Sequence, residues 1–127
     1  MSGEGNTYSV AYWPTEIRLK KTEKVLEVDF DDGSRFALPA ELLRVESPSA
    51  EVQGHGPGQK TLVAGRRHVG IMELVPVGNY AIRIRFDDLH DTGIYSWDYL
   101  YKLGRSKDEV WADYLAELEK RGLSRDP

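Results

Sequence analysis

Two pairs of strand-like runs, each interrupted by turn residues, constrain the fold of this chain more than any other feature. Residues 16–38 alternate between apolar and polar side chains on both sides of the turn sequence at residues 31–33. A three-residue loop with Gly33 in the left-handed conformation keeps the apolar side chains on one face. The pairs that then face each other are Val28 with Phe36 and Leu26 with Leu38. A two-residue loop would set Phe30 opposite Arg35, so we favour the longer loop.

Residues 69–86 predict a second hairpin around Gly78 and Asn79, because apolar residues alternate with arginines in its second half. A loop of odd length satisfies both faces of this hairpin. The predicted pairs are Met72 with Phe86, Leu74 with Ile84, and Glu73 with Arg85. Pro76 has no backbone N–H to donate, so we expect it at a sheet edge or a bulge.

Three helices are predicted from cap residues and helical spacing. Pro39 suits the first position of a short helix over residues 40–45, and Ser96 suits the N-cap of a second helix. Residues 106–109 have the pattern of a capping box before a final helix, which Gly122 would end in a left-handed conformation. The apolar stripe of that final helix consists of Val110, Trp111, Tyr114, Leu115 and Leu118.

Residues 46–67 contain Ser, Pro, Gly and His and have little periodicity. We predict a long loop here, broken by a short strand at residues 61–63. A loop of this length inside a compact domain is usually functional, mobile or misassigned. This segment is therefore the first place to look for a site.

The order of these elements predicts an α+β fold, in which antiparallel β-hairpins form a small sheet with the C-terminal helices packed on one face. A chain of 127 residues is long enough for one domain with its own core. We expect that domain over residues 14–121. Both ends are rich in small polar residues, so we expect a flexible N-terminus at 1–13 and a flexible C-terminus at 122–127.

The absence of cysteine removes whole classes of chemistry. The chain can form no disulfide, no thiolate metal site, no iron–sulfur ligation by itself and no thiol nucleophile. No catalytic arrangement of serine, histidine and acid is recognisable either. Residues 1–7 do not resemble a secretory signal and no apolar run is long enough to span a bilayer, so we expect a cytoplasmic protein without membrane partners.

Two polar clusters leave alternative functions open. Asp88, His90 and Asp91 gather carboxylate and imidazole donors, which would allow metal binding, although a solvated turn is the simpler interpretation. Arg66 and Arg67 could contact nucleic acid. The net charge of −4 and the lack of interleaved aromatic residues make nucleic acid an unfavoured partner, and charges that protect a strand edge are the simpler interpretation.

Aromatic residues crowd the last third of the chain. Most should pack helices onto the sheet, whereas an exposed subset would mark a partner-binding surface. We therefore predict a protein partner of unknown identity. The residues expected near its contact surface are Arg44, Ser47, His55, Tyr95 and Trp97.

Three segments together carry a resemblance to a known family: residues 38–44, residues 47–56 with their Ser-Pro-Ser-Ala-Glu and Gly-His-Gly sequences, and residues 92–100. Over residues 14–118 the chain resembles the gamma-butyrobetaine-hydroxylase-like N-terminal domain, which is also known as a bacterial stand-alone domain of unknown function. Similar domains precede iron- and 2-oxoglutarate-dependent oxygenases or are fused to iron–sulfur carrier ATPases. The resemblance therefore implies a non-enzymatic accessory domain that assists an oxygenase or an iron–sulfur protein.

In carnitine-pathway dioxygenases, the similar domain holds a structural zinc with three cysteines and one histidine. The resemblance places Ser47, Ser49 and Val52 at the cysteine positions and His90 at the histidine position. Three of the four ligands are therefore absent, and one histidine cannot build a closed tetrahedral zinc site. We expect neither this zinc nor any other cofactor.

Overall fold

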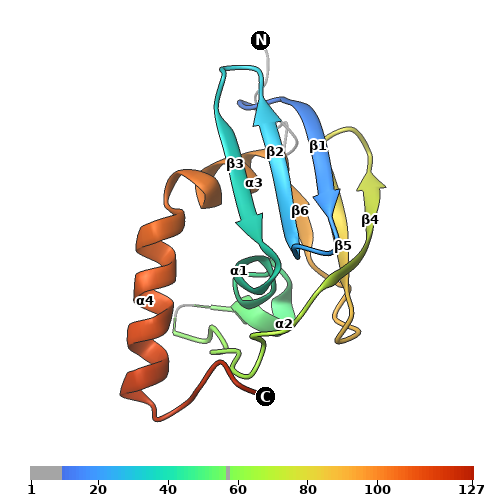
Figure 1. The fold of residues 1–127 in the computed structure, drawn as a ribbon. Helices are drawn as coiled ribbons and strands as arrows, with labels where there is room; N and C mark the ends of the chain where they lie inside the picture. Colours follow the sequence, from blue (N-terminus) through green and yellow to red (C-terminus); the bar gives the residue numbers. More distant parts are fainter. Residues whose placement is uncertain (1–9, 57) are drawn as a thin grey trace.

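The computed structural model describes residues 10–56 and 58–127 of the chain. Within this part, the predicted α+β class is confirmed, and the strands divide into two antiparallel three-stranded sheets (Figure 1). The first sheet has the strand order β1-β2-β3 and the second has the order β4-β5-β6. The strands are β1 (Pro14–Lys20), β2 (Val25–Phe30), β3 (Arg35–Pro39), β4 (Ile71–Val77), β5 (Ala81–Phe86) and β6 (Ile94–Ser96), and the helices are α1 (Ala40–Val45), α2 (Ala50–Gln53), α3 (Trp97–Arg105) and α4 (Lys107–Lys120).

The hairpin of β2 and β3 has the predicted register. Gly33 has a φ of +90°, and its N–H donates to the carbonyl of Phe30 over 3.0 Å. The loop therefore contains three residues, as predicted. The confirmed apolar pairs are Val28 with Phe36 and Leu26 with Leu38.

The hairpin of β4 and β5 confirms two of its three predicted pairs, Leu74 with Ile84 and Glu73 with Arg85. The predicted pairing of Met72 with Phe86 is wrong, because the register shifts between Ile71 and Glu73 and brings Ile71 opposite Phe86. This irregularity buries Ile71 and leaves Met72 48% exposed. Pro76 lies on β4, which is an edge strand as its missing N–H predicts.

The chain between α1 and β4 differs from the prediction. Pro39 is the N-cap of α1 and not its first helical residue, because its ψ of 146° is extended. The predicted loop contains the short helix α2, and the predicted strand at residues 61–63 is wrong. The backbone N–H of Thr61 donates to the carbonyl of Val52 over 2.6 Å, so this segment bonds to the end of a helix and pairs with no described strand.

The C-terminal helices begin where predicted. Ser96 caps α3, since its Oγ accepts the backbone N–H of Tyr99 over 3.1 Å. The predicted capping box before α4 is wrong. The Ser106 hydroxyl donates to the carbonyl of Lys102, 2.8 Å away, because α3 ends immediately before Ser106. Gly122 has a φ of +67° and ends α4 as predicted.

One core joins both sheets to α1 and α3. Its largest fully buried side chains include Leu26 and Leu38 of the first sheet, Ile84 and Phe86 of the second sheet, and Leu100 of α3. Helix α4 runs along one side of the molecule (Figure 1) and packs through a smaller cluster. The buried members of that cluster are Val45, Tyr114 and Leu118.

Both termini of the described chain make specific contacts. The backbone N–H groups of Ala11 and Tyr12 each donate to Asp98 Oδ1 over 3.1 Å, while residues 1–9 of the predicted flexible N-terminus lie outside the described residues. Residues 122–127, for which the sequence predicts flexibility, lie against residues 65–67 through two backbone hydrogen bonds. No helix in the described part of the chain combines the length and the apolar character needed to cross a membrane.

Candidate functional site

A buried polar cluster forms where the segment between α1 and α2 meets the turn after β5. His90 Nε2 lies 2.9 Å from Ser47 Oγ and 3.4 Å from Ser49 Oγ. Ser47 Oγ also donates to Ser49 Oγ over 3.2 Å and accepts the backbone N–H of Ser49. A side chain at Gly93 would overlap Ser47 Oγ, so the backbone closes tightly over the cluster. These three side chains satisfy one another's hydrogen bonds.

His90 is held neutral by its surroundings. Burial lowers the pKa of His90 below its ordinary value, and the positive charge of Arg44 lowers this pKa further. Three carboxylates act in the opposite direction without outweighing these effects; they are Glu51, Asp88 and Asp91. A neutral, buried imidazole in a hydrogen-bonded cluster suits a structural role better than proton transfer at neutral pH.

Asp88 connects this cluster to two arginines. Its Oδ2 accepts hydrogen bonds from Arg44 Nε and Arg66 Nε, both over 2.7 Å, and its Oδ1 accepts the backbone N–H of His90. Burial opposes the charged form of this carboxyl, but the hydrogen bonds from Arg44, His90 and Arg66 outweigh burial and hold the pKa of Asp88 below its ordinary value. Asp88 is therefore ionised and engaged from three sides.

A polar cavity of about 340 Å³ opens beside these groups. Arg44, Arg66 and His90 line it together with Glu51 and Val52 of α2. The remaining wall is formed by residues 61–64 of the long loop. The cavity thus borders the segment at residues 46–67, which the sequence indicates as the first place to look for a site.

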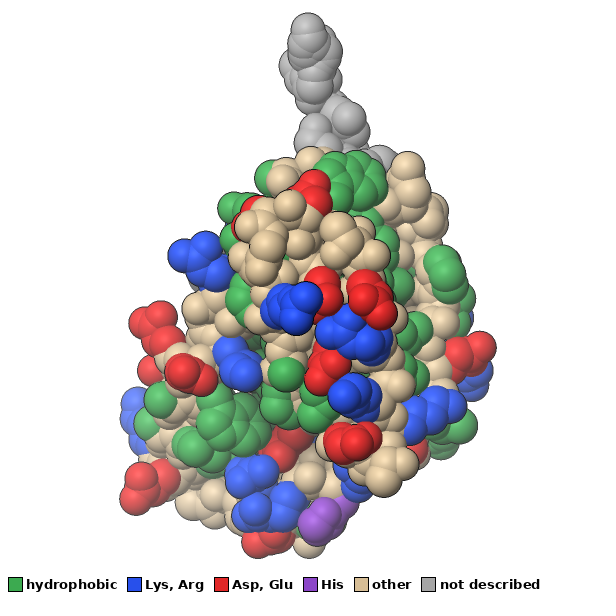
Figure 2. Space-filling model, turned by 45° about the horizontal axis from the view of Figure 1, so that its top comes forward, with side chains coloured by type: hydrophobic (Ala, Val, Ile, Leu, Met, Phe, Trp, Pro, Cys, Tyr) green, Lys and Arg blue, Asp and Glu red, His purple; other side chains and the backbone are tan. Residues whose placement is uncertain are grey.

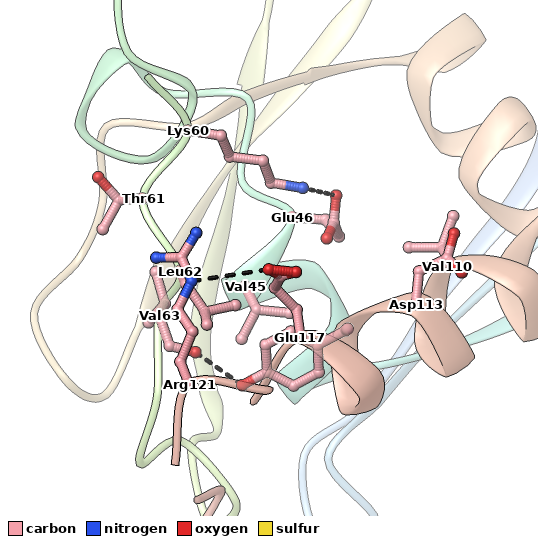
Figure 3. A pocket seen from close by; sticks show the side chains of 11 residues that line it. Val45, Glu46, Lys60, Thr61, Leu62, Val63, Val110, Asp113, Glu117 and Arg121 are labelled. Carbon is pink, nitrogen blue, oxygen red and sulfur yellow. Dashed lines mark hydrogen bonds and ion pairs between the residues drawn. The ribbon is translucent and has the colours of Figure 1, made fainter. Parts of the chain in front are cut away.

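A second cavity, of about 360 Å³, lies between α4 and the loop at residues 60–63 (Figure 3). Four of its charged side chains are paired, since Lys60 lies 2.7 Å from Glu46 and Arg121 lies 3.6 Å from Glu117, whereas Asp113 forms no ion pair with a described residue. The Tyr114 hydroxyl donates to the carbonyl of Val63 over 2.6 Å, and burial raises the pKa of Tyr114 to about 12. These contacts attach the loop to α4 and leave no group in the cavity poised for acid–base chemistry.

An apolar groove of about 430 Å³ separates α1 from α4. Its apolar lining is Pro39, Leu42, Trp111, Ala112 and Leu115, and its charged lining is Glu41, Lys107, Asp108 and Arg125. Leu115 is 39% exposed, so it lies at the edge of the helical stripe that the sequence predicts to be buried. Figure 2 shows hydrophobic side chains gathered on the side of the molecule where α4 lies, bordered by acidic and basic side chains.

The predicted partner-binding residues lie mostly in the interior. Ser47 and Tyr95 are fully buried, and Arg44 and Trp97 are each 8% exposed. Tyr95 and Trp97 donate hydrogen bonds to the carbonyls of Leu43 and Asn79, respectively. Only His55 of this set is exposed. The four buried side chains therefore support the fold around the cavities and offer little surface of their own.

Three residues of the two alternative functions are engaged in ion pairs, namely Asp88, Arg66 and Arg67. Among the metal candidates, Asp88 is bound by two arginines, while Asp91 is half-buried near His90. Within the described residues, no group of three or more histidine, aspartate or glutamate side chains is arranged to hold a metal ion. Arg67 pairs with Asp126, so it is also not a free cation in a basic patch.

Both the sequence and the fold of this chain are similar to those of known proteins. Residues 17–101, which span β1 to the middle of α3 and include both polar clusters, match the family model described as gamma-butyrobetaine hydroxylase-like, N-terminal. The chain belongs to this family. The resemblance seen in the sequence is thereby confirmed. A comparison with curated proteins gave no match.

Several solved structures are similar to this member of the gamma-butyrobetaine-hydroxylase-like N-terminal family. Two solution structures determined by NMR share 50% and 45% identity with it, with TM-scores of 0.80 and 0.79. The first alignment covers 91% of both chains, and the second covers 100% of this chain and 92% of the other. A crystal structure from Acidithiobacillus ferrooxidans, described as a protein of unknown function of the DUF971 family, shares 43% identity and a TM-score of 0.61, covering 72% of this chain and 91% of that one.

The zinc implied by the family resemblance does not fit the donor set of this chain. The four corresponding positions come together in the structure, since Ser47, Ser49 and His90 are hydrogen-bonded and Val52 lines the same cavity as His90. Their donors are two neutral hydroxyls and one imidazole, whereas a closed zinc site needs four ligands of the thiolate, imidazole or carboxylate type. In this chain, hydrogen bonds between Ser47, Ser49 and His90 connect these positions.

Proposed function

We propose that this chain is a non-enzymatic accessory domain that binds a partner protein through the groove between α1 and α4. The observation that carries the proposal is the partly exposed apolar lining of this groove, which lies apart from the polar clusters around His90 and Asp88. Trp111 and Leu115 are the large apolar side chains of α4 in this lining, and both remain at least partly exposed, whereas Leu42 is buried. Aromatic and aliphatic anchors of this kind supply most of the binding energy at protein interfaces.

The charges around the groove favour a basic partner segment. Of the charged residues that line it, Arg125 is held by two hydrogen bonds to Glu41, and the Lys107 ammonium donates to the carbonyl of Ala37. Asp108 is exposed and forms no ion pair with any described residue. Glu109 and Glu119 of α4 are also exposed and form no ion pair with any described residue.

The proposed partner therefore offers an aliphatic or aromatic side chain for the groove, with lysine or arginine beside it for the acids of α4. Complementary charge at the rim would orient the partner and speed association, while the apolar anchor would supply affinity. An accessory role fits a domain of this size, because a small interface of this kind can attach it to a larger enzyme.

Selection from a displayed library of random peptides tests this proposal. We expect enriched peptides that combine an aliphatic or aromatic residue with lysine or arginine, and that bind more weakly as salt is added. Leu115→Glu places a charge in the groove and should abolish their binding. Leu123→Glu is the matched control, because Leu123 is 44% exposed but does not line the groove.

Both variants should keep the dispersed NMR spectrum of the folded protein. Peptides that bind Leu115→Glu as well as the unmodified protein, or a selection that enriches no basic peptide, would overturn the proposal. In native cells, affinity purification should recover a stoichiometric partner with Leu123→Glu as bait but not with Leu115→Glu.

A further inference from the structure

The cavity lined by Arg44, Arg66 and His90 is separate from the proposed docking groove, since the two share no lining residue. We propose that this cavity binds a small oxyanion, namely the carboxylate or phosphate group of a small molecule, through the guanidinium groups of Arg44 and Arg66. The inference is independent of the proposed protein partner.

The N–H donors of Arg44 and Arg66 outnumber the acceptors that the described residues offer to them. A guanidinium carries five N–H donors. Toward the described part of the chain, Arg44 donates one hydrogen bond, from Nε to Asp88 Oδ2, and its buried Nη1 has no hydrogen-bond partner there. Arg66 donates from Nε to the same oxygen and from Nη1 to the carbonyl of Ala64. Two cations thus share one carboxylate oxygen, and several of their N–H groups have no partner within residues 10–56 and 58–127.

The burial of Arg44 makes this excess of donors significant. Its side chain is only 10% exposed, and a buried donor without an acceptor is costly for a protein. In native structures, such groups usually mark the place of a bound water or ion. An oxyanion supplies two or more acceptor oxygens at once, which is the geometry that a guanidinium binds best.

The cavity is accessible and of a suitable size. Its volume of about 340 Å³ falls in the range of small-molecule sites. The Arg66 side chain is 34% exposed, so a ligand can reach one guanidinium from solvent before it meets the other. Glu51 is the one carboxylate among the lining residues; its side chain is 62% exposed, its Oε1 accepts a hydrogen bond from Thr92, and its Oε2 lies 3.9 Å from His90 Nδ1.

NMR titration of the folded protein with inorganic phosphate, with acetate and with sodium chloride at equal ionic strength tests the inference. The Nε–Hε resonances of Arg44 and Arg66 report directly on the site. We expect saturable shifts of both resonances with phosphate or acetate and none with chloride. Saturation by phosphate alone would assign a phosphate ligand, and saturation by acetate alone would assign a carboxylate ligand.

Arg66→Gln should weaken the binding by about tenfold or more, because it removes charge-assisted hydrogen bonds. Arg67→Gln is the matched control: the neighbouring arginine pairs with Asp126, does not line the cavity and should leave binding unchanged. Arg66→Lys keeps the charge without the planar fork of donors, so it should bind with intermediate affinity if Arg66→Gln does not fold. Shifts that do not saturate, or equal losses in Arg66→Gln and Arg67→Gln, would overturn the inference.

Discussion

Ser47 Oγ and His90 Nε2 lie 2.9 Å apart in the interior of the domain, although 43 residues separate them in the sequence. This hydrogen bond joins the segment after α1 to the turn after β5. It therefore links the helical region between the sheets to the second sheet, at the positions where the family resemblance implies a metal.

Ser47→Ala removes the partner of the buried imidazole and should lower the free energy of unfolding by about 1–3 kcal/mol. Chemical denaturation measures this change. Ser124→Ala is the control, because Ser124 is exposed and its hydroxyl contacts only the nearby Asp126, so its effect should stay within about 0.5 kcal/mol. Equal stability of the Ser47→Ala variant and the unmodified protein would refute a structural role for the hydrogen bond.

The lowered pKa of His90 makes stability depend on pH. Above its ordinary pKa of 6.5, His90 is neutral in both the folded and the unfolded state. As the pH falls below 6.5, His90 is protonated in the unfolded state but not in the folded state. The free energy of unfolding therefore decreases until the pH reaches the lower pKa of His90 in the folded state. The slope approaches about 1.4 kcal/mol per pH unit.

Denaturation curves at several pH values between neutrality and mild acid measure this slope. His90→Gln should flatten it, while His55→Gln should preserve it because His55 is exposed. A slope that survives His90→Gln unchanged would show that another group is responsible.

Gly93→Ala should destabilise the protein by about 1–3 kcal/mol, because the added methyl group would overlap Ser47 Oγ and press against the Tyr95 ring. Thermal or chemical unfolding measures the loss. At Gly56 an added methyl group meets no atom within 4 Å, so Gly56→Ala should be close to neutral. Similar effects of the two substitutions would argue against tight packing around the cluster.

Replacing Ser47, Ser49 and Val52 together by cysteine should create a zinc site with His90, since this supplies the three thiolates that the chain lacks. The triple variant should bind one zinc ion and unfold at a higher temperature with zinc than with a chelator, because the metal stabilises the folded state. The unmodified protein should unfold at the same temperature in both conditions. Adding His90→Ala to the triple variant should weaken zinc binding, and no zinc uptake by a folded triple variant would contradict this placement of the four positions.

The candidate cavity could be predicted only in part. The long loop at residues 46–67 indicates where to look, and the family resemblance groups Ser47 and Ser49 with His90. The interaction of Asp88 with both Arg44 and Arg66 has no signal in the sequence, because these three residues come from distant segments. Of the groove residues on the last helix, Leu115 belongs to the apolar stripe that the sequence predicts, but its exposure beside the groove was not predicted.

The sequence by itself determined the features that depend on neighbours a few residues away. Alternating side chains and a left-handed Gly33 set the register of the first hairpin, and Ser96 and Gly122 mark the start of α3 and the end of α4. These features follow from local backbone conformation and from the need to place apolar side chains on one face.

Only the tertiary structure decided which partner a residue took where its local sequence allowed more than one. The Ser106 hydroxyl donates to a carbonyl of α3 and does not cap α4. Ile71, and not Met72, lies opposite Phe86. The backbone N–H of Thr61 donates to a carbonyl of α2. At Met72 and Thr61, a local preference of about 1 kcal/mol competes with contacts to another segment, whereas the hydroxyl of Ser106 chooses between two adjacent helices. Burial of whole side chains is worth more than such preferences, so the distant contacts prevail.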